Sequence, residues 1–185
     1  VLIIHLFFTY GGILLIFGKI NIFKFFSKMK NSMLFAFSTS SSAATIPINL
    51  KTVEENLGVK KSVASFTVPL GATINMDGTA ITQGVATVFL ANTYGVDLTM
   101  SDFMSVILIA TLASIGTAGV PGVGLIMLAM VLNQVGLPTE GIALIIGIDR
   151  ILDMTRTAVN VTGDATISCI VAKIEKKLDL KKLNS

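Results

Sequence analysis

The basic residues of this chain are gathered into short segments, and this separation constrains the fold more than any single motif. All twelve lysines lie in three clusters, at residues 19–30, 51–61 and 173–182. The segments between the clusters contain two basic residues, Arg150 and Arg156. The chain is 52% hydrophobic and 14% charged, with a mean hydropathy of +0.80. A soluble domain of this size needs a larger charged surface. The sequence therefore predicts a membrane protein without a nucleic-acid partner, in which the net charge of +3 reflects topology.

Lysine-rich loops mark the cytoplasmic side of a membrane protein, so we expect all three clusters to be cytoplasmic. Three apolar stretches, about 63–95, 103–132 and 141–172, lie between the second and third clusters. Three full crossings would place these two clusters on opposite sides, so one stretch is expected to enter and return. The middle stretch is the candidate, because its centre ASIGTAGVPGVG (113–124) contains four glycines and Pro121, which interrupt a helix.

A second segment, Met33 to Leu50, has lysines on both flanks and the polar run STSSSAATIP at its centre. We expect it to enter from the cytoplasmic side and return. The two tips end in Pro47 and Pro121, and an aspartate follows each about thirty residues later, Asp77 and Asp153. Units that enter from opposite sides form an inverted repeat, a common plan of secondary transporters. Non-helical backbone at membrane depth must be buried or line a watery cavity, so two tips predict a cavity.

The segment GIDRILDMTRTAVNVTGD, residues 147–164, carries a polar stripe. At about 100° per residue, six side chains fall within an arc of about 100°; they are Asp149, Asp153, Arg156, Thr157, Asn160 and Asp164. Charged groups at membrane depth are costly unless they face a partner or a cavity, so the stripe is expected to face the protein interior. The simpler alternative is an intrahelical ion pair, which needs fewer aligned positions than this stripe provides.

Four motifs, SSSAATIP, GATINMDGTA, SIGTAGVPG and DMTRTAVNVTGD, occur in this order and at spacings that resemble the carboxyl-terminal half of the glutamate transporter family, the dicarboxylate/amino acid:cation symporters. The resemblance covers almost the whole chain and weakens only in residues 1–30 and in the final ten. It implies an all-α membrane protein, the transport-domain half of an elevator-type symporter with two re-entrant helical hairpins and inverted repeats. In such a protein a mobile domain carries substrate and sodium past a trimeric scaffold, whose helices this chain lacks.

The resemblance divides the chain into six segments. They are a transmembrane helix at 1–20 (the sixth of the family), re-entrant hairpin 1 at 22–50, a transmembrane helix with an unwound NMDGT at 62–95, re-entrant hairpin 2 at 102–133, transmembrane helix 8 at 141–173, and a basic cytoplasmic tail at 174–185. Hairpin 2 would be the extracellular gate. The chain starts inside an apolar run without a cleavage site, so we expect a helix entered part-way rather than a signal peptide. The tail is expected to be a solvated end, with binding to anionic lipid as the alternative.

The resemblance also implies a substrate site. Its residues would be Ser40, Ser41, Ser42, Thr79, Val120, Pro121, Gly122, Gly124, Asp153, Arg156, Thr157 and Asn160. Arg156 offers a planar, always-charged fork to a side-chain carboxylate. Asp153 would accept from the substrate α-ammonium, and Asn160 would bond its α-carboxylate. In the family the position of Arg156 sorts acidic from neutral substrates, so the expected substrate is aspartate or glutamate.

Three sodium sites are implied as well. Sodium prefers hard oxygen ligands, many of them carbonyls exposed where helices unwind. The first site would use the carbonyls of Gly71, Asn75 and Asn160 with the Asp164 carboxylate. The second would use the carbonyls of Thr73, Ser114, Ile115 and Thr117. The third would use the side chains of Asn75 and Asp77 with residues of an earlier helix that this chain lacks. The alternative is a protonated Asp77 that donates to a carbonyl.

Several positions depart from the family pattern. Prokaryotic relatives often have an arginine at the position of Ser40, and animal relatives have one at the position of Met154. We expect that Arg150, one turn before Met154, could supply this charge by snorkelling. Gln83 replaces a glutamate that is linked to proton coupling in animal members, which favours coupling to sodium alone. We expect no functional role for His5.

The expected function is therefore sodium-coupled secondary active transport of an acidic amino acid across the cell membrane, by a multi-pass protein that is a homotrimer at full length and not an enzyme. The alternative within the family is a proton-coupled glutamate or C4-dicarboxylate symporter. An intramembrane aspartyl protease is an alternative from another class, since TGD at 162–164 matches part of its motif. However, Val161 stands where that motif requires glycine, and aspartates that share a proton should not have an arginine beside one of them. A sodium channel, which would conduct without saturable uptake, is a third possibility.

Overall fold

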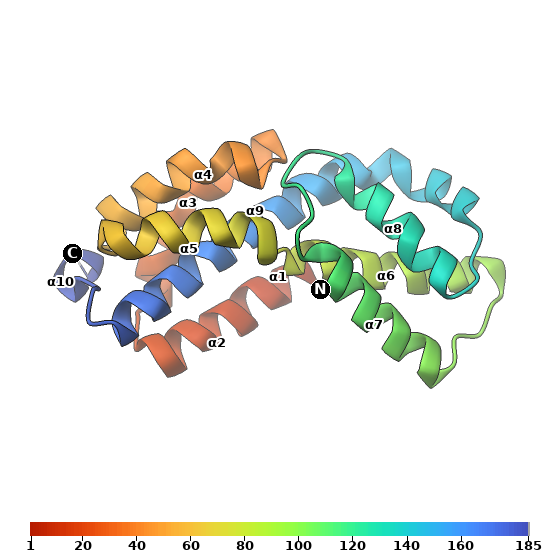
Figure 1. Ribbon diagram of the computed structural model, residues 1–185, viewed down its shortest axis with the longest axis horizontal. Helices are drawn as coiled ribbons and strands as arrows, with labels where there is room; N and C mark the ends of the chain where they lie inside the picture. Colours follow the sequence, from red (N-terminus) through yellow and green to blue (C-terminus); the bar gives the residue numbers. More distant parts are fainter. Residues whose placement is uncertain (185) are drawn as a thin grey trace.

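The computed structural model describes residues 1–184, and its regular elements are all helical (Figure 1). Among these residues, the only strand-like pairing is an isolated antiparallel bridge between Val59 and Leu178. The expected all-α fold is confirmed. The helices are α1 (Leu2–Ile4), η1 (His5–Tyr10), α2 (Gly11–Ile13), η2 (Leu14–Gly18), α3 (Ile22–Thr39), α4 (Ser42–Lys51), η3 (Thr52–Asn56), α5 (Lys61–Ile74), α6 (Asp77–Tyr94), α7 (Met100–Ser114), α8 (Val123–Gln134), η4 (Thr139–Gly141), α9 (Ile142–Ile174) and α10 (Leu180–Asn184).

Helix α9 runs through the whole molecule and organises the other helices around it (Figure 1). Helices α3, α4 and α5 pack on one half of α9, and α6 and α8 pack on the other half, with α7 against α6 and α8. Each half has its own apolar core. Phe25 and Leu14 are fully buried in the first core, and Leu90 and Leu132 in the second. The polar middle of α9 lies between these two cores.

Side-chain caps explain where several helices begin. Asn21 accepts a hydrogen bond from the Lys24 N–H at 3.2 Å and starts α3. Thr99 and Asp102 form a reciprocal capping box at the start of α7, in which Asp102 Oδ2 accepts from the Thr99 N–H at 2.8 Å. Within the described residues, no single helix has both the length and the apolar composition required for a membrane crossing.

The helix expected at 62–95 is interrupted at Asn75 and Met76, which separate α5 from α6. Both residues have non-helical backbone angles, with φ −108° and ψ 69° at Asn75. The interruption is narrower than the expected unwinding of all of NMDGT, because Asp77 already begins α6. The break therefore frees a short piece of backbone beside α9.

Most residues of the tail are exposed, yet the tail also folds back onto the molecule. Leu183 is fully buried in the first core. The Asp179 N–H donates to the Gly58 carbonyl at 2.9 Å, and the Lys60 N–H donates to the Lys177 carbonyl at 3.0 Å. Ser185, the last residue of the expected tail, lies outside the described residues.

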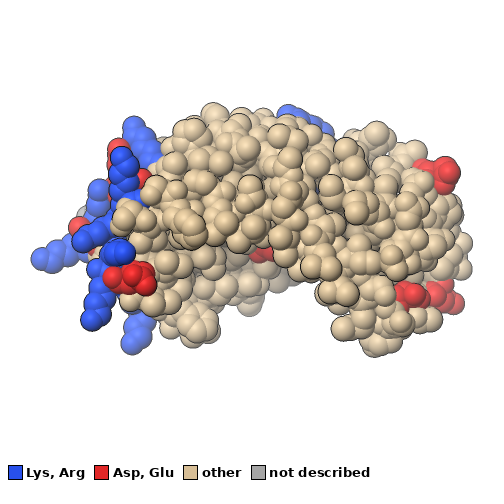
Figure 2. Space-filling view, in the orientation of Figure 1, with Lys and Arg blue, Asp and Glu red and all other residues tan. Residues whose placement is uncertain are grey.

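The lysine clusters come together at the end of the molecule that carries α10, where Figure 2 shows most of the basic side chains. Lys28 Nζ donates to the Lys182 carbonyl at 2.7 Å, which joins the first cluster to the third. The backbone bond from Lys60 to Lys177 joins the second to the third. The opposite end shows acidic side chains only (Figure 2). The three lysine clusters thus share one end of the molecule, which we call the basic end.

Candidate substrate and cation site

The polar stripe of α9 faces the protein interior, as predicted. Its side chains belong to residues that are only 3–6% exposed; they are Asp149, Asp153, Arg156, Thr157, Asn160 and Asp164. Burial of this many polar groups is costly unless they are paired. The contacts of each group therefore indicate what the stripe can bind.

Two carboxylates hold the guanidinium of Arg156. Its Nε donates to Asp153 Oδ1 at 3.0 Å, and its Nη1 donates to Asp149 Oδ1 at 3.3 Å. Nη2 lies 3.0 Å from Asp153 Oδ1 as an ion pair but makes no aligned hydrogen bond. The intrahelical ion pair is thus present, and it leaves one buried N–H edge for a ligand. Gly124 lies against this guanidinium so closely that a side chain there would overlap it.

Eight of the twelve predicted substrate residues line one small cavity. These eight are Ser40, Ser42, Thr79, Val120, Asp153, Arg156, Thr157 and Asn160. Of the other four, Gly122 donates its N–H to Asp153 Oδ2 at 2.8 Å, whereas Pro121 is exposed. The free space is about 10 Å³, enough for one water molecule. An amino acid can enter only if part of the lining moves.

The α3–α4 turn and the α7–α8 loop meet at this cavity. Ser41 Oγ and the Ala43 N–H both donate to the Gly119 carbonyl, at 2.7 Å and 3.1 Å. A Cβ at Gly119 would lie 3.1 Å from Ser42 Cβ, which is a tight contact, so the absence of a side chain at Gly119 eases this close approach. Ser40 adopts a left-handed conformation with φ 52°, and its hydroxyl is buried without a partner. The two tips that the sequence predicted therefore touch one another.

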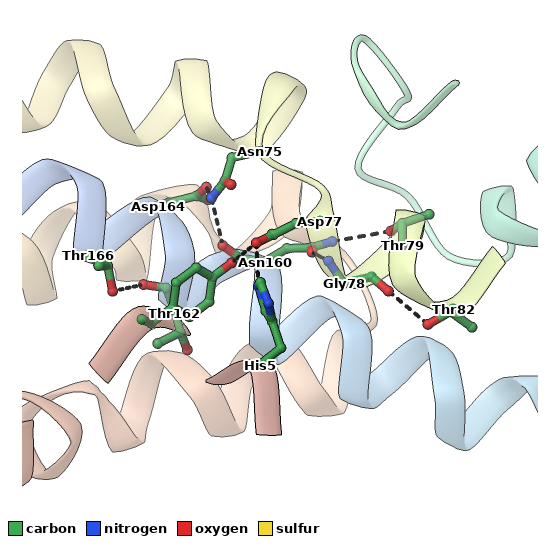
Figure 3. A network of polar contacts seen from close by, with 11 residues as sticks. His5, Asn75, Asp77, Gly78, Thr79, Thr82, Asn160, Thr162, Asp164 and Thr166 are labelled. Carbon is green, nitrogen blue, oxygen red and sulfur yellow. Dashed lines mark hydrogen bonds and ion pairs between the residues drawn. The ribbon is translucent and has the colours of Figure 1, made fainter. Parts of the chain in front are cut away.

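The residues of the first predicted cation site also come together (Figure 3). Asn75 Nδ2 donates to Asp164 Oδ1 at 2.9 Å and lies 3.5 Å from the Asn160 carbonyl. The Asn75 N–H donates to the Gly71 carbonyl at 2.8 Å, and the Gly71 Cα lies directly against the Asp164 carboxylate. The interruption between α5 and α6 thus faces the buried acid of α9.

The second predicted cation site joins the end of α5 to the end of α7. The Gly116 N–H donates to the Thr73 carbonyl at 2.7 Å, and the Thr117 N–H donates to the Ser114 carbonyl at 3.5 Å. Ser114 and Thr117 are each 4% exposed, whereas the Ile115 side chain is exposed. Main-chain oxygens of both segments therefore lie close together.

Asp77 of the third predicted cation site contacts two residues that sequence reasoning did not assign. His5 Nε2 lies 2.6 Å from Asp77 Oδ2, and the Tyr10 hydroxyl donates to the same oxygen at 2.5 Å. His5, for which no functional role was expected, thus contacts a residue of a predicted cation site. Asp77 meets these side chains rather than a carbonyl. A histidine inside an otherwise apolar run was the available signal.

The structure shows the surroundings of Arg150 and Gln83, two residues that concern departures from the family pattern. Arg150 is exposed and makes no ion pair among the described residues, so it does not supply the charge that Met154 lacks. Gln83 is 2% exposed, and both its amide atoms lack a hydrogen-bond partner. It lines a small space next to Asp149 and Arg156. An amide, which does not titrate, therefore lines the same small space as the guanidinium.

The described residues contain no cluster of three or more His, Cys, Asp or Glu side chains that could hold a metal ion. The gathered oxygens instead belong mainly to backbone carbonyls and to amide side chains, with single carboxylates at Asp77 and Asp164. Unwound helices in transporters bind sodium with ligands of this kind.

Residues 1–174 match the model of the sodium:dicarboxylate symporter family. The chain is 44% identical over 180 residues to human excitatory amino acid transporter 2. This match covers 95% of the chain and 30% of the relative. It is 40% identical over 181 residues to the proton/sodium-glutamate symport protein of Geobacillus stearothermophilus, a match that covers 98% of the chain and 42% of the relative. It is 47% identical over 157 residues to mouse excitatory amino acid transporter 3, a match that covers 85% of the chain and 30% of the relative.

The chain thus spans between 30% and 42% of the length of these curated relatives. The match supports the expected membrane location. The matched family is one of transporters and not of enzymes, so the protease alternative is not favoured. By both its motifs and its match over 174 residues, the chain belongs to the sodium:dicarboxylate symporter family.

Proposed function

We propose that the full-length protein carries out sodium-coupled secondary active transport of an acidic amino acid, aspartate or glutamate. The observation that carries this proposal is the buried Arg156, which has one unpaired N–H edge beside a cavity that Asp153 and Asn160 also line. The names of the relatives, which are excitatory amino acid transporters and a proton/sodium-glutamate symport protein, support the same substrate class.

Each proposed substrate contact uses a different group of the cavity. The Arg156 fork binds the side-chain carboxylate in a charge-assisted pair. Asp153 accepts from the α-ammonium and is already held by the Gly122 N–H. Asn160 and Ser42 bind the α-carboxylate. A substrate with charges of both signs thus meets a complementary charge at each end.

The three proposed sodium sites lie next to this cavity and share residues with it. Asn160 lines the cavity with its side chain, while its carbonyl lies beside the Asn75 amide and close to Asp164. Met76, which stands between Asn75 and Asp77 in the sequence, also lines the cavity. A cation that orders the break between α5 and α6 would therefore order one wall of the substrate cavity, which couples the two binding events.

Membrane arrangement and assembly complete the proposal. Segments 22–50 and 102–133 are the re-entrant hairpins, and the basic end faces the cytoplasm. The loop between α7 and α8 is the extracellular gate, because the space of about 10 Å³ must open for an amino acid to enter. The domain moves as an elevator against the scaffold of a homotrimer.

A second candidate is proton-coupled transport by the same site, which the name of the Geobacillus relative favours. The buried amide of Gln83 argues against it, because an amide does not take up a proton at this position.

The proposal is tested by uptake of radiolabelled aspartate into liposomes that contain the full-length protein. An inward sodium gradient should concentrate aspartate, and a proton gradient without sodium should not. Accumulation driven by protons alone would favour the second candidate. Sodium conductance without saturable aspartate uptake would refute both and indicate a channel.

A further inference from the structure

We propose that Tyr10 and His5 are positioning residues of the third cation site, which hold the Asp77 carboxylate so that one of its oxygens is left for sodium. This inference rests on the proposed function. It concerns residues of the first helical segment, whereas the sequence motifs place the cation ligands on α5, α6, α7 and α9. The contact of His5 with Asp77 can be followed in Figure 3.

Both side chains act on the same carboxylate oxygen. Tyr10 donates to Asp77 Oδ2 at 2.5 Å, and His5 Nε2 lies 2.6 Å from this oxygen. The other oxygen, Oδ1, is buried and has no hydrogen-bond partner. A carboxylate with one oxygen held by two groups has a fixed orientation, and its second oxygen is the one that a cation can bind.

The two rings support one another and are largely shielded from solvent. Tyr10 is 3% exposed, and the His5 side chain is 16% exposed. Their ring centroids are 4.8 Å apart with an edge-to-face angle of 68°, a favourable arrangement for aromatic rings. The pair is therefore a fixed unit rather than two mobile side chains.

The local helix geometry brings both rings to one face. His5 and Tyr10 are the first and last residues of the π-helical segment η1. In an α-helix, residues five apart point about 140° away from each other. The wider turn of a π-helix, with its i→i+5 hydrogen bonds, brings such residues close to alignment. The π-helical turn is thus the device that allows two residues of one helix to reach one carboxylate.

Tyr10 also connects the third cation site to the first. Its hydroxyl lies against Gly163 of α9, where a side chain would overlap it. A Cβ at Gly163 would also lie 2.5 Å from Asn75 Nδ2, which donates to Asp164. Removal of the hydroxyl would take away one of the two groups that hold Asp77, without taking away any proposed sodium ligand.

The experiment measures the sodium dependence of aspartate uptake by the full-length protein in liposomes. Tyr10→Phe is compared with Tyr94→Phe, which changes the only other tyrosine of the chain, 41% exposed at the end of α6. Loss of one hydrogen bond to a charged group should raise the half-maximal sodium concentration about tenfold or more. Aspartate affinity at saturating sodium should stay within about twofold of wild type, and Tyr94→Phe should leave both values unchanged.

A second pair of variants covers the case in which Tyr10→Phe does not fold. His5→Gln keeps a polar group within reach of Asp77, whereas His5→Ala does not, so the sodium requirement should rise more in His5→Ala. The inference is overturned if the folded variants keep the wild-type sodium requirement. It is also overturned if aspartate affinity at saturating sodium falls as much as sodium affinity, since that indicates a merely structural role. A wild-type protein without sodium dependence would refute the proposed function itself.

Discussion

Replacement of Arg156 by alanine tests the proposed substrate site most directly. The guanidinium contacts Asp153 at 3.0 Å and Asp149 at 3.3 Å, and it has one buried edge without a hydrogen bond. The substitution removes the proposed partner of the substrate side-chain carboxylate. It also leaves two carboxylates buried without their cation, so its effects on binding and on folding must be separated.

Both effects can be estimated. A hydrogen bond to a charged group contributes about 1.5–3 kcal/mol, which corresponds to a loss of about 10- to 150-fold in aspartate affinity. Serine has no side-chain carboxylate and should lose little. Removal of one partner of a buried ion pair costs about 3–5 kcal/mol in stability. The double variant Arg156→Ala, Asp149→Asn removes one of the unpaired charges, so it should recover part of this stability but none of the aspartate affinity.

The assay is competition of unlabelled aspartate and serine against radiolabelled substrate in the full-length protein, with thermal unfolding measured in parallel. The expected result is a preference that shifts from aspartate toward serine in the single variant and in the double variant. The reasoning is refuted if the folded double variant binds aspartate within about threefold of wild type. It is equally refuted if serine and aspartate weaken by the same factor.

Three further substitutions test other parts of the structure. Gly124→Ala places a methyl group against the Arg156 guanidinium, so aspartate uptake should require at least about tenfold more substrate while the sodium requirement changes little. Asp164→Asn removes a carboxylate from the first cation site, so sodium titration of uptake should show a half-maximal concentration raised about tenfold or more, and an unchanged value would contradict that site. Leu183→Ala opens a cavity in the first core, which should lower the free energy of unfolding by about 2–5 kcal/mol and make the tail sensitive to protease. Resistance to protease equal to that of wild type would show that the tail does not need this contact.

The central part of the site could be predicted because it depends on simple periodicity and composition. A polar stripe on an apolar helix must face the interior at any membrane depth, and the stripe ending at Asp164 does so. The two turns were also predicted, at Ser40 and Ser41 between α3 and α4 and in the glycine-rich loop between α7 and α8, although their meeting at Gly119 was not.

The contacts of the first helical segment could not be predicted in this way. An α-helical period separates His5 from Tyr10, and only the π-helical turn brings them together on Asp77. The docking of the tail was not predicted for a different reason, because its many lysines drew attention away from the two apolar positions that dock it, Leu178 and Leu183. Arg150 shows the limit of reasoning from helical proximity alone, since it lies one turn from Met154 and yet is exposed.

Asn160 links the substrate cavity to the first predicted cation site. Its side chain accepts from the Gly78 N–H at 2.8 Å and donates to Thr79 at 3.3 Å, so it fixes the start of α6 beside the substrate cavity. Its carbonyl faces Asn75, on the other side of the helix break. A cation that binds this carbonyl therefore acts on the residue that also contacts the substrate. Because such coupling is reciprocal, the factor by which sodium raises aspartate affinity must equal the factor by which aspartate raises sodium affinity.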